Sequence, residues 1–186
     1  MENFSLSTGC LNVHFARMGV PIFNKDVFRF ARWLYANKLQ IMSDTGLRIE
    51  VIHPVLTTSA PRNFRQLEER VLKWCEIKNE LYNGQAGLQL SINSTSESQR
   101  DEMFRCMQIR LDDLSKIAER LPEPKSRKYC LNFAYATNFE IDSKHLSSFS
   151  CARSLRFITM ILAEQIVFKL SEDTKVINHI ENQRMT

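Results

Sequence analysis

The stretch PRNFRQLEERVLKWCEIKNELYNGQAGLQLSI, residues 61–92, indicates the fold class, because a helical pattern passes directly into a strand pattern within it. Pro61 suits the first turn of a helix, and Asn83-Gly84 is a common helix end. Apolar residues then alternate over 88–92, which is the period of a strand. We therefore predict a long helix from Pro61 to about Asn83, followed at once by a short strand.

Strand patterns and helix patterns also follow one another before and after this stretch. Alternating apolar residues predict further strands, and Pro54 should limit one of them to an edge position or a short length. These strands are expected around 11–15, 47–51 and 129–135. Capping residues and helical periods predict helices over about 24–40, 96–121 and 147–170.

Strands separated by helices are typical of the α+β (mixed α/β) class. We expect a single compact domain over residues 1–170, with four to five helices, two of them long and heptad-patterned. The sheet should be small, with three to four short strands. Residues 171–186 are polar and are expected to form a frayed C-terminal tail.

Two of the predicted helices carry apolar stripes at heptad spacing. In the 61–83 helix the stripe is interrupted by Lys78, whereas in the 96–121 helix it runs unbroken. Such stripes suit side-by-side packing of helices, either within one chain or against another copy or a protein partner. The unbroken stripe, taken as the candidate interface, consists of Phe104, Met107, Leu111, Leu114, Ala118 and Leu121.

Basic side chains next to aromatic ones form the second pattern. Lysine and arginine neutralise phosphates, and exposed aromatic rings stack on bases. No RNP, KH, zinc-finger or double-stranded-RNA signature accompanies the pattern, so a solvated charged face is the other interpretation. The candidate RNA-binding residues are Arg29, Arg32 and Trp33 on the first helix, Lys125, Arg127 and Lys128 in a loop, and Arg153 and Arg156 further on.

Patterns that would indicate an enzyme or a metal site are few. The four histidines are scattered, and neither a GxSxG, HExxH or P-loop motif nor ordinary zinc-ligand spacing occurs. A Cys/His hydrolase is the enzymatic alternative, either through Cys130 with His145 of Asp142-x-x-His145 or, on a helix only, through Cys10 with His14. We expect no enzyme activity, no metal and no cofactor.

Composition indicates an ordinary globular protein, with 186 residues, 44% of them hydrophobic, and a net charge of +4. Residues 1–15 lack a signal-peptide pattern, and the apolar run 157–168 is too short for a membrane span of about 20 residues. The five cysteines are odd in number and widely spaced, so all should be reduced, and Cys75 and Cys106 should be structural. The expected location is intracellular, cytoplasmic or nuclear, and not secreted.

These patterns predict a non-enzymatic protein-interaction module that self-associates through its unbroken heptad helix. The expected partner is a protein or a second copy, with neither a membrane nor a small-molecule cofactor. Sequence-independent RNA binding is the alternative, and a dimer would duplicate every basic cluster.

Overall fold

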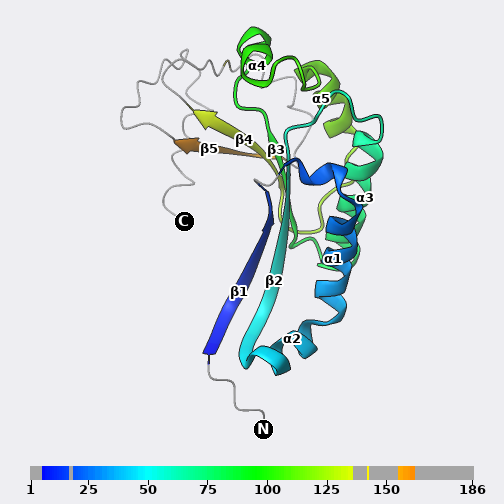
Figure 1. Ribbon diagram of the computed structural model, residues 1–186, viewed down its shortest axis with the longest axis vertical. Coiled ribbons are helices and arrows are strands. Elements are labelled where there is room, and N and C mark those ends of the chain that lie inside the picture. Colours follow the sequence, from blue (N-terminus) through cyan, green and yellow to red (C-terminus); the bar gives the residue numbers. More distant parts are fainter. Residues whose placement is uncertain (1–5, 17–18, 136–141, 143–154, 162–186) are drawn as a thin grey trace. The chain divides into compact units, whose positions relative to one another are not determined.

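The computed structural model describes residues 6–16, 19–135, 142 and 155–161. It divides into two compact units, the first formed by Met1–Thr58, Phe64–Gln89 and Leu121–Tyr129, and the second by Ser59–Asn63, Leu90–Arg120 and Cys130–Thr186. Helices and strands alternate along the described chain, which confirms the mixed α/β class (Figure 1). A single domain over residues 1–170 stays a prediction.

In the first unit, β1 (Leu6–Phe15), β2 (Leu47–Thr58) and the beginning of β3 (Gly87–Ser91) are neighbours in that order. β1 and β2 are parallel, in a register that runs from Leu6 opposite Leu47 to Phe15 opposite Leu56. The three predicted strands are therefore confirmed, although β1 and β2 are longer than expected.

The prediction for Pro54 is wrong. β2 continues through this residue for 12 residues and lies between β1 and β3. Pro54 lies opposite Val13 in the register and is buried. A proline removes one backbone donor from the ladder, and here the other residues of a long strand maintain the pairing on both sides.

The helices of the first unit are α1 (Lys25–Ala36), α2 (Lys38–Thr45) and α3 (Leu67–Glu80), with a short 3-10 turn η1 at Pro21–Phe23. Asn24 caps α1 as predicted, since its side chain accepts from the amide of Asp26 at 2.9 Å. The helix expected over 24–40 is interrupted at Asn37 and continues as α2. Figure 1 shows α1 and α3 on the same side of β1 and β2.

The core of the first unit is built around Trp74 of α3, which is fully buried. The rings of Phe15 and Phe28 meet it edge-on, with centroids 5.9 and 6.1 Å away. Its indole N–H donates to the carbonyl of Gly87 at 2.8 Å, so the indole is satisfied although it is buried. This one side chain thus joins α1, α3, β1 and β3.

The interruption of the α3 stripe at Lys78 has a structural explanation. Lys78 is fully buried, donates to the carbonyl of Gly84, and lies 5.6 Å from the centroid of the Tyr129 ring. Gly84 has a φ of +79°, and a Cβ there would collide with the backbone of Ser126. α3 begins at Leu67 and not at Pro61, and it ends at Glu80, before the predicted end at Asn83-Gly84.

In the second unit, the end of β3, β4 (Tyr129–Tyr135) and β5 (Leu155–Ile161) are neighbours in that order. β4 has the predicted bounds, but β5 lies where a helix was expected, so that prediction is wrong over 155–161. The segment LRFITMI contains three β-branched residues, and a short apolar run suits either structure. Residues 147–154 and 162–170 of the expected helix, and the predicted tail 171–186, lie outside the described residues.

The single helix predicted over 96–121 is also wrong. α4 (Glu97–Phe104) and α5 (Leu111–Glu119) are separated by a break at which Arg105 and Cys106 have φ values of 50° and 59°. The apolar stripe is therefore divided: Met107 is 51% exposed, Phe104 and Leu121 are half-buried, and Leu111, Leu114 and Ala118 are buried.

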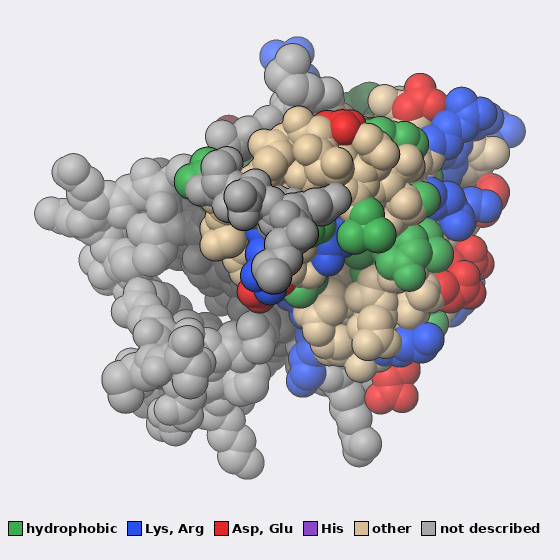
Figure 2. Space-filling view, turned by 90° about the horizontal axis from the view of Figure 1, so that it is seen from below, with side chains coloured by type: hydrophobic (Ala, Val, Ile, Leu, Met, Phe, Trp, Pro, Cys, Tyr) green, Lys and Arg blue, Asp and Glu red, His purple; other side chains and the backbone are tan. Residues whose placement is uncertain are grey.

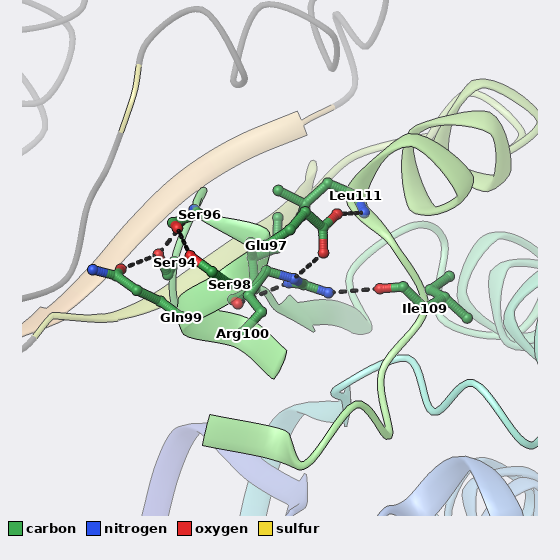
Figure 3. A network of polar contacts seen from close by, with 9 residues as sticks. Ser94, Ser96, Glu97, Ser98, Gln99, Arg100, Ile109 and Leu111 are labelled. Atoms are coloured by element: carbon green, nitrogen blue, oxygen red, sulfur yellow. Dashed lines mark hydrogen bonds and ion pairs between the residues drawn. The ribbon is translucent and has the colours of Figure 1, made fainter. Parts of the chain in front are cut away.

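Interactions of Arg100 and Glu97 explain this break (Figure 3). The buried guanidinium of Arg100 donates to the carbonyls of Ile92 and Ile109 at 2.9 and 2.7 Å. Glu97 lies 3.6 Å from Arg100 Nε and accepts from the amide of Leu111 at 2.6 Å. In a continuous helix, Arg100 and Ile109 would be about 13 Å apart along the axis. The break brings Ile109 within reach of Arg100 and lets Glu97 cap α5.

The two cysteines expected to be structural differ in their surroundings. Cys75 is fully buried, and burial raises the pKa of its thiol to about 11. Cys106 is exposed at the helix break, so the expectation of a structural role for it is wrong. At pH 8 a thiol with this raised pKa has about 100-fold less thiolate than one with a pKa of 9.0.

We expect Cys75 to react with iodoacetamide at least about 100-fold more slowly than Cys106 in native protein at pH 8. Peptide mass spectrometry after timed quenching measures both rates in one sample. In denaturant the two rates should converge. Equal rates in native protein would mean that Cys75 is accessible and would contradict the packing described for α3.

Candidate nucleic-acid interface

One side of α1 carries a row of cations. Lys25, Arg29 and Arg32 recur at intervals of four and three residues, so they share one side of the helix. All three are exposed, while Phe28 and Leu34 are buried on the side that packs on the unit. Arg29 also forms an exposed ion pair with Asp26 at 3.2 Å, which contributes little to stability.

Between α1 and α3 lies a groove of about 290 Å³, which we call the α1–α3 groove. Five of its eight lining residues are cations and one is a carboxylate. Within the described part of the chain, Lys25, Arg32 and Lys73 form no ion pair with a carboxylate. Its lining residues are Lys25, Phe28, Arg29, Arg32, Gln66, Glu69, Arg70 and Lys73.

Arg70 is the most enclosed cation of the groove, with only 8% of its surface exposed. Its guanidinium lies over the rings of Phe28 and Phe64, 5.5 and 5.8 Å from their centroids. One side-chain hydrogen bond, to Gln66 Oε1 at 3.5 Å, is long. A guanidinium has five N–H donors and is only weakly hydrated, so Arg70 has donors to offer to an anion in the groove.

Trp33 and Phe30 form an exposed aromatic pair next to the cationic row. Their rings are stacked, with centroids 5.6 Å apart and an interplanar angle of 13°. Trp33 is 50% exposed and Phe30 44%. Trp33 therefore stacks on Phe30. The ring of Phe15 packs edge-on against the ring of Phe30, with centroids 6.1 Å apart.

Figure 2 views the molecule from the end at which Figure 1 draws α2. Blue Lys and Arg side chains follow one margin of this face, with red acidic and green hydrophobic side chains between them. Charged and apolar groups are thus interleaved on the face, as a ligand with both phosphates and rings requires.

The second predicted basic cluster, Lys125, Arg127 and Lys128, is exposed in the loop before β4. The loop is fixed by a hydrogen bond from the Arg127 amide to the Gly84 carbonyl at 3.0 Å. Arg127 Nη1 lies 3.2 Å from Nδ1 of His53 on β2.

The structure does not bring Arg127 to the α1–α3 groove. The β1–β2 register sets Asn12 opposite His53, and Asn12 and Phe15 point to opposite faces because side chains alternate along a strand. Since Phe15 packs toward α3, Arg127 approaches the other face of the sheet. Arg153 lies outside the described residues, and Arg156 lies on β5, where only the backbone is described.

Sequence reasoning did not identify Lys25, Arg70, Lys73 and Phe30 as part of this surface. The packing of α3 against α1 brings Lys73 and Arg70 to the groove, and that packing depends on residues far apart in the sequence.

A thiol and an imidazole also meet on the first unit. Cys10 Sγ lies 2.9 Å from Nδ1 of His53, on the neighbouring strand. Cys10 and His14, the pair considered from the sequence, are separated by about 13 Å of strand. His145, the proposed partner of Cys130, lies outside the described residues. Among the residues that the structure describes, no three His, Cys, Asp or Glu side chains lie together as potential metal ligands.

The chain matches no family model, no curated protein and no solved structure. Among the described helices, none is long and apolar enough to cross a membrane.

Proposed function

We propose that the first unit binds single-stranded RNA without reading its sequence, with backbone phosphates in the α1–α3 groove. The supporting observation is the excess of cations there, including the enclosed guanidinium of Arg70. Cations without carboxylate partners attract a polyanion and release its counterions on binding. Such contacts are independent of base identity, so affinity should vary little between sequences.

The aromatic pair favours a single strand over a duplex. Bases of a single strand are free to stack on exposed rings, which contributes about 1–3 kcal/mol per base. Trp33 presents such a ring on the same helix as Arg29 and Arg32, so one strand can contact both. The groove would then hold phosphates while the indole of Trp33 receives a base.

Replacing Trp33 by alanine should weaken binding of a fluorescein-labelled oligouridylate by about 1–2 kcal/mol, or roughly 5- to 30-fold in Kd. Fluorescence anisotropy measures both affinities. Tyr35→Ala is the matched control, because Tyr35 is an equally exposed aromatic residue of α1 on a different side of the helix. Equal losses in both variants, or no loss at Trp33, would exclude stacking on this ring.

Binding of a protein partner is the second proposal. The observation that favours it is a set of exposed large hydrophobic side chains on η1, α1 and α2, namely Phe23, Phe30, Trp33, Tyr35 and Leu39. Self-association through Leu111, Leu114 and Ala118 would first require these side chains to become exposed, because they are buried. The absorbance ratio at 260 and 280 nm of freshly purified protein discriminates between the proposals, since only the first predicts retained nucleic acid.

A further inference from the structure

The face of the β1–β2 pair opposite α1 carries a cluster of three polar side chains. Cys10, on β1, and His53, on β2, lie 2.9 Å apart, and Arg127 reaches the same ring nitrogen at 3.2 Å from the loop before β4. The thiol and the guanidinium are therefore within about 6 Å of each other. None of the three lines the α1–α3 groove.

His53 can accept a proton at pH 7, although its imidazole is a weaker base than an exposed one. Burial and, to a lesser extent, the positive charge of Arg127 lower the pKa of its imidazole below the usual 6.5. The ring is therefore neutral at pH 7. Arg127 can only donate, so Nδ1 must carry a lone pair and the ring proton must be on Nε2. That lone pair also faces the thiol.

The surroundings of Cys10 permit access by a small molecule. Cys10 is half-buried, and among the described strands β1 has one neighbour, β2, so it lies at an edge of the sheet. Two other cysteines provide internal comparisons. Cys75 is fully buried, and Cys106 is exposed at the α4–α5 break, where its φ is 59°.

We propose that Cys10 is a site of reversible modification by small anionic disulfides, with His53 as the proton acceptor and Arg127 as the group that attracts the anion. The Cys10 proton moves to His53 Nδ1 as Arg127 gives up its hydrogen bond to that nitrogen, and the thiolate attacks one sulfur of the disulfide. A new S–S bond forms as the original S–S bond breaks, and the leaving thiolate takes up the proton. Cys10 is oxidised to a mixed disulfide, and the other half of the reagent is reduced to a thiol.

The test uses 5,5′-dithiobis(2-nitrobenzoic acid), a disulfide with two carboxylates, on the full chain at pH 7. We expect one fast thiol per chain, which peptide mass spectrometry assigns to Cys10, reacting at least about 10-fold faster than Cys106. Cys10→Ser should remove the fast phase, and Cys106→Ser should leave it. Assignment of the fast phase to another cysteine, or equal rates for Cys10 and Cys106, would overturn the proposal.

Two further measurements separate the roles of the neighbours. Arg127→Gln should slow the anionic reagent about 10-fold relative to neutral 4,4′-dithiodipyridine, because only the anionic reagent is attracted by the guanidinium. In the wild-type protein, lowering the pH through the depressed pKa of His53 should protonate the imidazole and remove the rate advantage of Cys10 over Cys106. This second readout needs no variant. A rate ratio that is unchanged by acidification would exclude His53 as the proton acceptor.

Discussion

Replacing Arg100 by methionine should lower the free energy of unfolding by about 3–5 kcal/mol, a large part of the roughly 5–15 kcal/mol typical of a domain. Arg100 is 2% exposed and binds the carbonyls of Ile92 and Ile109 (Figure 3). Methionine would fill much of the space but leave both carbonyls and the Glu97 carboxylate without this partner. Urea unfolding followed by circular dichroism measures the loss.

The charge of Arg100 is maintained by its neighbour. Burial lowers the pKa of the guanidinium, and the carboxylate of Glu97 acts in the opposite direction. Lys116→Met is the control, because Lys116 also pairs with an acidic residue, Asp113 at 3.0 Å, but in an exposed position. The control should change stability by less than about 1 kcal/mol. Similar small effects for both variants would show that Arg100 does not hold the α4–α5 break.

Reversing two charges of the α1–α3 groove should nearly abolish RNA binding. We expect Arg32→Glu combined with Lys73→Glu to reduce binding by at least about 2–3 kcal/mol, or roughly 30- to 150-fold in Kd. Both cations line the groove without a carboxylate partner among the described residues, so phosphates would meet repulsion in place of attraction. Fluorescence anisotropy with labelled oligouridylate measures the change.

The control for this variant must alter the net charge equally. Arg110→Glu with Lys116→Glu also exchanges two exposed cations for two carboxylates, on residues of the second unit that are not in the groove. We expect less than about a 3-fold change in Kd, because neither residue lines the groove and exposed charges that do not contact a ligand contribute little. Equal losses in the two variants would assign binding to net charge and not to the groove.

Local patterns were sufficient to locate four of the five described strands, all except β5, and one helix cap. Alternation alone predicted β4 over 129–135 with the bounds that the structure has, and Asn24 caps α1 as its residue type indicated. These features depend on residues within one or two turns of each other, so sequence spacing describes them well.

The heptad pattern of 104–121 led to a wrong prediction because the spacing of residues does not show where a helix is interrupted. The break at Arg105-Cys106 is stabilised by contacts of Arg100 and Glu97 with residues 8 to 14 positions away. Prediction from residue spacing does not include such contacts, so it extends the helix through the break. Leu111, Leu114 and Ala118 form the buried side of α5, and their regular spacing reflects this one helix.

The candidate site was predicted only in part for the same reason. Arg29, Arg32 and Trp33 share a helix, so their exposure followed from the period of α1. The groove also needs Arg70 and Lys73, and the Cys10–His53 pair joins residues 43 positions apart. Both arrangements depend on tertiary packing and strand register, which the spacing of residues along one element does not contain.

The salt dependence of RNA binding tests phosphate recognition in the groove most directly. Anisotropy titrations of an oligouridylate of about 12 nucleotides should show binding at about 50 mM salt, with log Kd rising linearly with log salt. For three to four phosphates, the slope of log affinity should be about −2 to −3, which weakens binding roughly 15- to 60-fold by 200 mM. The Arg32→Glu/Lys73→Glu variant should show a shallower slope. Absence of binding at about 50 mM, or an affinity that does not change with salt, would contradict the account.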